Sequence, residues 1–359
     1  MTVHLQRAVK GAAAAEVRWL ENISRRVVWV EVDETVRRGA LSAEASGVIA
    51  HAADTAREKG LPLVMTIGSS GADIVEGVAA LHGWGLAAKA IAKCSGYVPI
   101  FTVVTGPAVS GPALLIGLSD IVIMTSDAYA FVTGPTMVAE FTGVVISNDE
   151  RGGSDIHAKQ SGVAHIVVAD RESAIAEVEH VLSFLPNNVN EITAAASTAD
   201  TIDRFTPEAG ELIPDSATGA YDVKAVIRSI ADDGYMLELR ERWAGNIVTG
   251  FITIGSQSVG VVANQPMNLA GTLDIPASQK AARFVSFCDA FNIPILTLVD
   301  TPGFYPGKDL EWRGMIRHGA QLVFAYGRAT VPRICIILRK SYGGAYIVMD
   351  SKKMGNDLC

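Results

Sequence analysis

The sequence has little charge of either sign and no local excess of positive charge. It contains 30 lysine and arginine residues against 38 aspartate and glutamate residues, and its formal net charge is −8 over 359 positions. A nucleic-acid-binding surface needs a dense basic patch, so this balance argues against a nucleic acid partner.

Long hydrophobic runs are also missing. The longest apolar stretch covers residues 113–124, is interrupted by Ser119 and Asp120, and is too short to cross a bilayer. The alanines at positions 12–15 are followed by Glu16 and Arg18, which interrupt the apolar core that a signal peptide needs. We therefore expect a cytoplasmic protein with no membrane partner.

Cysteine and histidine are sparse. The four cysteines lie far apart without a CxxC pair, and the seven histidines show no metal-ligand spacing. This pattern argues against a disulfide framework, a zinc ribbon and a metal site, and predicts plain thiols at Cys94, Cys288 and Cys335. The phosphate-binding GxxxxGK loop, a GxGxxG turn after a strand and a GxSxG elbow are absent, which disfavours nucleotide hydrolysis and a serine hydrolase.

The sequence does have a large apolar fraction and an internal repeat. Apolar residues make up 49% of the chain, and its length predicts about two domains. Near Leu61 and again near Ile293, a proline-led apolar run is typical of a strand buried on both faces. Each run leads into a glycine-containing turn, an apolar helix, a second buried strand, and a small-residue turn that opens another helix.

The two copies keep a nearly constant register. Four landmark pairs are 232 or 233 positions apart, namely Pro62 and Pro294, Gly71 and Gly303, Pro99 and Pro332, and Gly111 and Gly344. This register predicts two related α/β domains, each built on a β-α-β-α unit. We place the first domain at residues 1–195, a connecting segment at 196–235 and the second domain at 236–359, with a hairpin near its start.

The small-residue turn after the second strand of each copy is a candidate site. A strand that ends in Ser110-Gly111 or Gly343-Gly344-Ala345 and turns into a helix presents backbone N–H groups without internal partners. Small side chains let a ligand carbonyl approach, so each turn resembles an oxyanion hole. Close packing of strand and helix is the alternative explanation. Because the turn occurs in both copies, we favour two holes, which suit a reaction between two carbonyl compounds.

Several long stretches of the chain are distinctive. The second half contains NIVTGFITIGSQSVGVVANQPMNLAGTLDIPASQKAARFVSFCDAFNIPILTLVDTPGFYPG and LVFAYGRATVPRICIILRKSYGGAYIVM, and the first half contains FVTGP, GGSDIHAKQSGVAHIV and LSFLPNN. Over residues 27–359 these stretches resemble the carboxyltransferase (β) subunits of biotin-dependent acyl-CoA carboxylases, of the propionyl-CoA and acetyl-CoA carboxylase type.

The resemblance implies a fold and a reaction. The fold is two crotonase-like β-β-α domains of the ClpP/crotonase superfamily, the first binding acyl-CoA and the second binding biotin, with the second domain truncated at its C-terminus. The reaction moves a carboxyl group from carboxybiotin, carried on a separate protein, to the α-carbon of propionyl-CoA or acetyl-CoA. The biotin ureido anion takes the α-proton, so that no side-chain base is required and no metal is involved.

The resemblance also implies roles for individual residues. Ser110 and Gly111 would hold the thioester carbonyl, whereas Gly344 and Ala345 would hold the ureido oxygen of biotin. Ile347 would line the acyl pocket. The other implied substrate-binding residues are Ser70, Gly71, Ala72, Gly134, Pro135, Gly303, Phe304, Gly343 and Tyr346. Because no Met-Lys-Met attachment motif is present, the expected partners are a biotin carboxylase and a biotin carboxyl carrier subunit, within a homo-oligomer or a hetero-oligomer of related chains.

The first domain departs from the family pattern, which leaves alternatives open. The family's SGGAR turn ends here in Asp73 in place of arginine, and its FGGSLG segment begins here with Arg37 and Arg38. Beside the carboxylase we therefore consider the α subunit of a biotin-dependent acyl-CoA decarboxylase and a non-catalytic paralogue that assembles with an intact carboxyltransferase. A crotonase-type hydratase would need an acid/base carboxylate, for which Asp73 and Asp350 are candidates.

Overall fold

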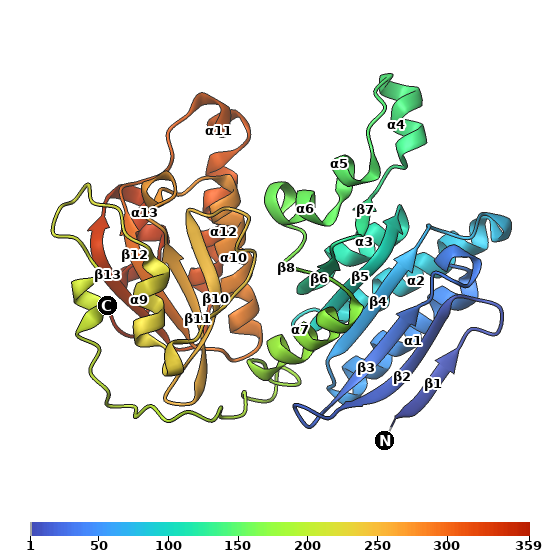
Figure 1. Ribbon diagram of the computed structural model, residues 1–359, viewed down its shortest axis with the longest axis horizontal. Coiled ribbons are helices and arrows are strands. Elements are labelled where there is room, and N and C mark those ends of the chain that lie inside the picture. Colours follow the sequence, from blue (N-terminus) through green and yellow to red (C-terminus); the bar gives the residue numbers. More distant parts are fainter. Residues whose placement is uncertain (1) are drawn as a thin grey trace. The chain divides into compact units, whose positions relative to one another are not determined.

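The computed structural model describes residues 2–359, without the side chains of residues 135 and 136. The chain divides into two compact units (Figure 1). The first unit comprises the described residues up to 183 together with 187–191, and the second comprises 184–186 together with 192–359. Within the described residues, no helix combines the length and the apolar character that crossing a membrane requires.

The first unit is built on an 8-stranded sheet with the order β1-β2-β3-β4-β5-β6-β8, with β7 paired to β5. Its strands are β1 (Val3–Arg7), β2 (Ala13–Leu20), β3 (Arg25–Val32), β4 (Leu63–Ser69), β5 (Ile100–Val109), β6 (Ile121–Thr125), β7 (Tyr129–Phe131) and β8 (Ile166–Val168). Strands β1 to β3 pair antiparallel, and β3 to β6 pair parallel. Parallel strands need helical crossovers, which the sequence supplies between β3 and β5.

The helices of the first unit cover both faces of this sheet. They are α1 (Ala43–Lys59), α2 (Val78–Cys94), α3 (Gly111–Gly117), α4 (Pro135–Thr142), α5 (Asn148–Gly152), α6 (Ser154–Ile156) and α7 (Arg171–Ser183), with short turns η1 (Arg37–Gly39), η2 (Ile74–Glu76) and η3 (His157–Ser161). Helices α1 and α2 pack on one face through alanines and branched residues (Figure 1). Helix α7 contacts β5, β6 and β8 on the other face of the sheet. Alternate residues of these strands point to that face, because successive side chains of a strand point in opposite directions.

The second unit contains a 5-stranded sheet with the order β13-β12-β11-β10-β9. Its strands are β9 (Leu237–Glu238), β10 (Ile247–Ile254), β11 (Gln257–Asn264), β12 (Ile295–Thr301) and β13 (Arg333–Ser341). Its helices are α8 (Glu208–Glu211), α9 (Val223–Ile230), α10 (Ile275–Ala290), α11 (Lys308–Trp312), α12 (Met315–Arg328) and α13 (Gly343–Val348), with turns η4 (Asp232–Gly234), η5 (Leu269–Gly271) and η6 (Lys352–Met354). The predicted hairpin is β10 and β11, which pair antiparallel from Ile247 opposite Asn264.

The two units repeat one architecture, which confirms the predicted pair of related α/β domains. In each, an antiparallel hairpin is followed by two parallel strands, β3-β4-β5 in the first unit and β11-β12-β13 in the second. The helix after each hairpin is capped alike, because Ser42 accepts from the Ala45 N–H and Asp274 accepts from the Ala277 N–H. These two N-cap residues are 232 positions apart, so the two units share the same capping hydrogen bond at equivalent positions.

The predicted connecting segment, residues 196–235, is grouped with the second unit. Its helix α9 has an amphipathic pattern and buries Val223, Val226 and Ile227 in a core with β10 and β11. Most of the segment before α9 has no regular secondary structure.

Candidate active site

In the first unit, β4 leads into the turn Ser70-Gly71-Ala72. The backbone of this turn is held by the segment after η1, because Leu41 donates its N–H to the Gly71 carbonyl at 2.8 Å and accepts from the Asp73 N–H at 2.9 Å. Leu41 and Ala72 form a parallel bridge, in which Leu41 bonds to the residues on either side of Ala72 and the Ala72 N–H points away from Leu41. Within the described part of the chain, the Ala72 N–H has no partner, so it is available to a ligand.

The neighbouring turn joins β5 to α3 through Ser110. This serine has φ 65° and ψ −121°, and its N–H donates to the Phe131 carbonyl at 2.9 Å. The next N–H, that of Gly111, opens α3 and has no partner among residues 2–359. A Cβ on Gly71 would lie 4.0 Å from the Ser110 Cβ, so the two turns are adjacent. The two available donors are therefore Ala72 and Gly111, and the N–H of Ser110 is already used in pairing with β7.

The second unit repeats the first turn after β12. Leu273 donates its N–H to the Gly303 carbonyl at 3.1 Å and accepts from the Tyr305 N–H at 2.9 Å. Gly303 has φ 148° and its counterpart Gly71 has φ 120°, and both are positive values that favour glycine. Phe304 takes the place of Ala72, and no described residue accepts its N–H.

The second unit also repeats the turn that opens the short helix. Gly343, at φ 60°, takes the place of Ser110, and Gly344 follows as the second residue of α13. A Cβ on Gly344 would lie 3.7 Å from the Phe304 ring, so this turn lies beside the Phe304 turn. Among residues 2–359, neither the Gly343 nor the Gly344 N–H has an acceptor, since the second unit has no counterpart of the bond from Ser110 to Phe131. The counterparts of the first pair of donors are Phe304 and Gly344. Ala345 is fully buried at 0% exposure, so its methyl group packs α13 against the sheet.

A cleft of about 410 Å³ adjoins the first pair of turns. It is lined by Glu34, Arg38, Ser70, Pro107, Val109, Tyr129, Phe131 and Asn148. The Tyr129 and Phe131 rings stack at 5.5 Å and form an apolar wall, while Arg38 supplies a positive charge. Ser70 was the one lining residue among the predicted site residues. Glu34 and Asn148 were missed, because neither belongs to a motif and the sheet brings them together from distant segments.

Arg37 and Asp73, two residues of the first unit that depart from the family pattern, contact each other. The Arg37 guanidinium contacts the Asp73 carboxylate at 2.7 Å, and Asp73 is only 4% exposed. The Arg37 guanidinium therefore neutralises the carboxylate that stands where the family has an arginine, and this ion pair adds no net positive charge to the β4 turn. Asp73 also caps η2 by accepting from the Val75 N–H at 3.0 Å. These contacts give the carboxylate a structural role, and they leave it poorly placed as an acid/base group.

Asp350, the other candidate acid/base group, is buried at 0% exposure below α13. It pairs with Arg333 at 2.5 Å, and burial raises its pKa to about 6 in spite of that partner. A carboxylate closed off in this way has no access to a substrate. The hydratase alternative therefore has no acid/base group at either position.

The remaining predicted residues take different places. Gly134 is the N-cap residue of α4, which extends away from the sheet (Figure 1), while the side chain of Pro135 lies outside the described residues. Tyr346 and Ile347 both lie on α13, and Ile347 is 53% exposed. No group of three metal-binding side chains occurs in the part of the chain that is described.

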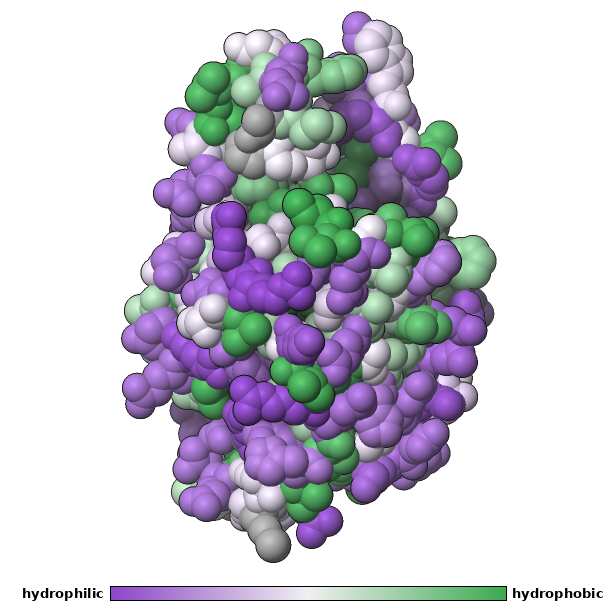
Figure 2. All heavy atoms as spheres, turned by 90° about the vertical axis from the view of Figure 1, so that its right-hand side faces the viewer, coloured by the Kyte–Doolittle hydropathy of each residue, from purple (hydrophilic) through white to green (hydrophobic). Residues whose placement is uncertain are grey.

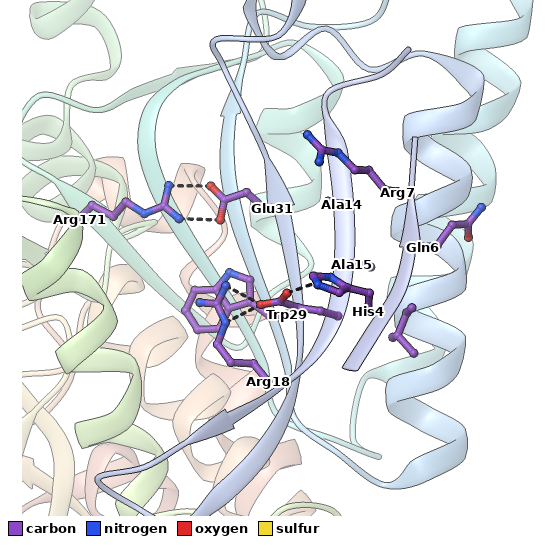
Figure 3. Close-up of a pocket in the computed structure, with 11 residues that line it drawn as sticks. His4, Gln6, Arg7, Ala14, Ala15, Arg18, Trp29, Glu31 and Arg171 are labelled. Atoms are coloured by element: carbon purple, nitrogen blue, oxygen red, sulfur yellow. Dashed lines mark hydrogen bonds and ion pairs between the residues drawn. The ribbon is translucent and has the colours of Figure 1, made fainter. Parts of the chain in front are cut away.

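A second hollow of about 550 Å³ lies on the β1-β2-β3 face of the first unit, away from these turns (Figure 3). Two of its three arginines are paired with its two glutamates. Arg171 contacts Glu31 at 2.6 Å, and Arg18 contacts Glu16 at 2.8 Å while its guanidinium lies 4.1 Å from the centre of the Trp29 ring. The third arginine, Arg7, contacts neither glutamate (Figure 3), so the lining carries a net positive charge.

Comparison with known proteins identifies relatives over most of the chain. The family model of the carboxyl transferase domain matches residues 22–359. The propionyl-CoA carboxylase beta chain of Roseobacter denitrificans is 44% identical over 93% of this chain and 66% of its own length. The methylmalonyl-CoA decarboxylase subunit alpha of Veillonella parvula is 40% identical over 90% of this chain and 64% of its own length.

A solved structure shows the same fold. Transcarboxylase 12S, with methylmalonyl-coenzyme A and methylmalonic acid bound, aligns with a TM-score of 0.94 and 38% identity, covering 97% of this chain and 68% of its own. A long-chain acyl-CoA carboxylase aligns with a TM-score of 0.84 and 26% identity over 97% of this chain. The chain spans less than two thirds of the length of the first curated relatives that it matches.

Proposed function

This chain belongs to the carboxyl transferase family, and from that premise we propose that it moves a carboxyl group between biotin and the α-carbon of a short acyl-CoA. The observation that carries the proposal is the repeated pair of available N–H groups, Ala72 with Gly111 and Phe304 with Gly344. A reaction between two carbonyl compounds needs two such sites. Methylmalonyl-CoA, propionyl-CoA and biotin all occur in the names of the relatives.

The first pair would hold the thioester oxygen of the acyl-CoA. When the α-proton leaves, negative charge moves onto that oxygen, and donors already in place stabilise it without reorganisation. Removing one donor of such a hole typically lowers the rate by about 10²- to 10³-fold. The stacked aromatic wall beside Ser70 and Val109 would accept an apolar part of the substrate, and Arg38 would meet a negatively charged part.

The second pair would hold the ureido oxygen of biotin. Three features of the second unit fit this group. Within the described residues, the Phe304 and Gly344 N–H groups have no acceptor, positions 343 and 344 are glycine, and a Cβ built on Gly343 would meet no atom within 4 Å. Carboxybiotin supplies the carboxyl group when it is bound. The residues of this chain would bind the ureido oxygen and orient the ring, and the exposed apolar side chain of Ile347 would suit a plain alkyl acyl group.

Biotin would reach this chain on a separate carrier protein, after carboxylation by a biotin carboxylase. Assembly with further carboxyltransferase chains is part of the proposal, because apolar side chains are exposed on one helix of each unit. Leu81 and Leu86 of α2 are each 59% exposed, and Ile316 and Phe324 of α12 are 82% and 67% exposed. Figure 2 shows one face of the molecule, on which hydrophobic side chains lie among hydrophilic ones. Transcarboxylase 12S is described as a hexamer.

The test uses the purified chain with free biotin and either malonyl-CoA or methylmalonyl-CoA, and it follows release of CO₂ together with formation of the decarboxylated acyl-CoA. We expect both products in equal amounts, and only when biotin is present. An assembled holoenzyme with its carrier then shows whether the net direction is carboxylation or decarboxylation. Absence of biotin-dependent turnover in that holoenzyme would support the non-catalytic paralogue.

A further inference from the structure

The register between β12 and β13 breaks immediately before the second pair of donors. Val299 lies opposite Ile337, but Thr301 lies opposite Ser341, so one intervening residue on β12 faces three on β13. Such an irregularity removes ladder partners from the backbone groups inside it. The N–H of Lys340 is one of these groups, and a buried N–H without an acceptor costs about 1–3 kcal/mol.

Asp300, the intervening residue on β12, supplies that acceptor with its side chain. Its Oδ1 accepts from the Lys340 N–H at 3.1 Å, and its Oδ2 accepts from the Tyr221 hydroxyl at 2.9 Å and from Arg339 Nε at 3.2 Å. Its own N–H donates to Asn264 Oδ1 at 3.3 Å. Asp300 is 0% exposed. Its carboxylate joins β12 to β13 and to the segment before α9, and its backbone N–H joins β12 to β11.

The first unit has the same break in register but no carboxylate at the corresponding position. Its register breaks at the same place, because Ile67 lies opposite Val104 whereas Ser69 lies opposite Ala108. The counterpart of Lys340 is Pro107, which has no N–H and needs no acceptor. The counterpart of Asp300 is accordingly Gly68. The exchange of Asp with Lys for Gly with Pro fits a carboxylate that serves the broken register. It also removes the two cations that pair with Asp300, because the counterparts of Arg339 and Lys340 are Gly106 and Pro107.

We infer that Asp300 is a positioning residue for the second hole, and that it keeps the Phe304 and Gly344 donors at a fixed separation by bridging the broken register between β12 and β13. The inference rests on the proposed function for the role of that hole. Phe304 lies four residues after Asp300, and Gly344 lies four residues after Lys340, so the Asp300–Lys340 bond is a cross-link immediately before both donors. A carboxylate that accepts a backbone N–H makes a strong, charge-assisted bond, which suits this function.

The test compares three variants in the full chain. Asp300→Gly removes the cross-link and leaves the Lys340 N–H without an acceptor. Asp300→Gly with Lys340→Pro transplants the arrangement of the first unit. Tyr221→Phe is the matched control, because it removes another hydrogen bond to the same carboxylate without touching either strand end.

Two measurements decide the outcome. In the biotin-dependent assay, we expect Asp300→Gly to lower kcat/KM for free biotin by roughly tenfold to a hundredfold, since misplacing one donor costs this much. Binding of acyl-CoA by the first unit should be unchanged, the double variant should recover part of the loss, and Tyr221→Phe should keep wild-type kinetics. Amide hydrogen exchange of residues 301–305 and 341–346 should rise in Asp300→Gly and fall again in the double variant.

The two proposals fail in different ways. A wild-type holoenzyme without biotin-dependent turnover contradicts the proposed function, while the hydrogen-exchange result still decides whether Asp300 orders the two strand ends. Unchanged exchange in Asp300→Gly, or a double variant no better protected than the single one, would overturn the positioning role. A loss of activity in Tyr221→Phe equal to that in Asp300→Gly would also overturn it, because the effect would then be one of general stability.

Discussion

The substitution Gly111→Ala should damage the first hole specifically. A Cβ at this position would lie 2.8 Å from both Cδ1 and Nε1 of Trp84, which belongs to α2. Carbon atoms in contact normally stay about 3.5–4.0 Å apart, so either the indole or the Gly111 backbone must move by about 1 Å. The indole is half-buried between α2 and α3, and over-packing of this kind costs about 1–3 kcal/mol.

Movement of the Gly111 backbone would displace a donor of the thioester hole. We expect kcat/KM for the acyl-CoA to fall by about 10²-fold, with kcat/KM for free biotin changed much less when acyl-CoA is saturating. Gly117→Ala is the control, since it lies at the end of the same helix and its Cβ would meet nothing within 4 Å. Replacing Trp84 by alanine in the Gly111→Ala background should restore part of the activity.

The assay is steady-state kinetics with each substrate varied, accompanied by thermal denaturation of every variant. A Gly111→Ala protein with wild-type kcat/KM and unchanged Tm would refute both the steric clash with Trp84 and the role of the Gly111 N–H as a donor. A protein that loses stability but keeps its activity would show that Trp84 packs there without any consequence for the hole.

Three further predictions concern stability. Lys280→Met should lower the free energy of unfolding by about 3 kcal/mol or more in urea titrations, because the ammonium donates to three backbone carbonyls at 2.8–2.9 Å in a buried position. Because burial raises the Asp350 pKa from 3.8 to about 6, the folded protein binds its proton more tightly than the unfolded one. Stability contributed by this group should therefore fall as pH rises from 4 to 6, and Asp350→Asn should flatten that slope in thermal scans. Gly39→Ala should prevent folding of the first unit, as judged by circular dichroism, because the Cβ would lie 1.9 Å from the Gly68 carbonyl oxygen at a φ of 68°.

Much of the fold was predictable because its information is local and repeated. Proline-led apolar runs predicted strands buried on both faces, and the constant offset predicted two copies of one unit. The same offset placed candidate holes after β5 and β13, where the structure has turns with available N–H groups. The family relationship follows from the same stretches, because buried strands and tight turns tolerate few residue types.

The choice of donors within each turn depended on long-range pairing. The sequence made Ser110 a candidate donor, but in the structure its N–H donates to Phe131 of β7, about twenty residues later in the chain. Ala72 and Phe304 became donors because the segments at Leu41 and Leu273 bind the turn from one side only. A sequence pattern does not reveal which of several adjacent N–H groups a distant strand will use.

The sequence by itself therefore determined the class of fold, the repeat, the family and the location of the two turns. Tertiary structure decided which backbone groups remain free, that Arg37 meets Asp73, and that Asp300 closes a broken register. The physical reason is the range of each interaction. Burial and glycine conformations are properties of short segments, whereas the partner of a polar group is set by whichever distant residue the sheet brings within hydrogen-bonding distance.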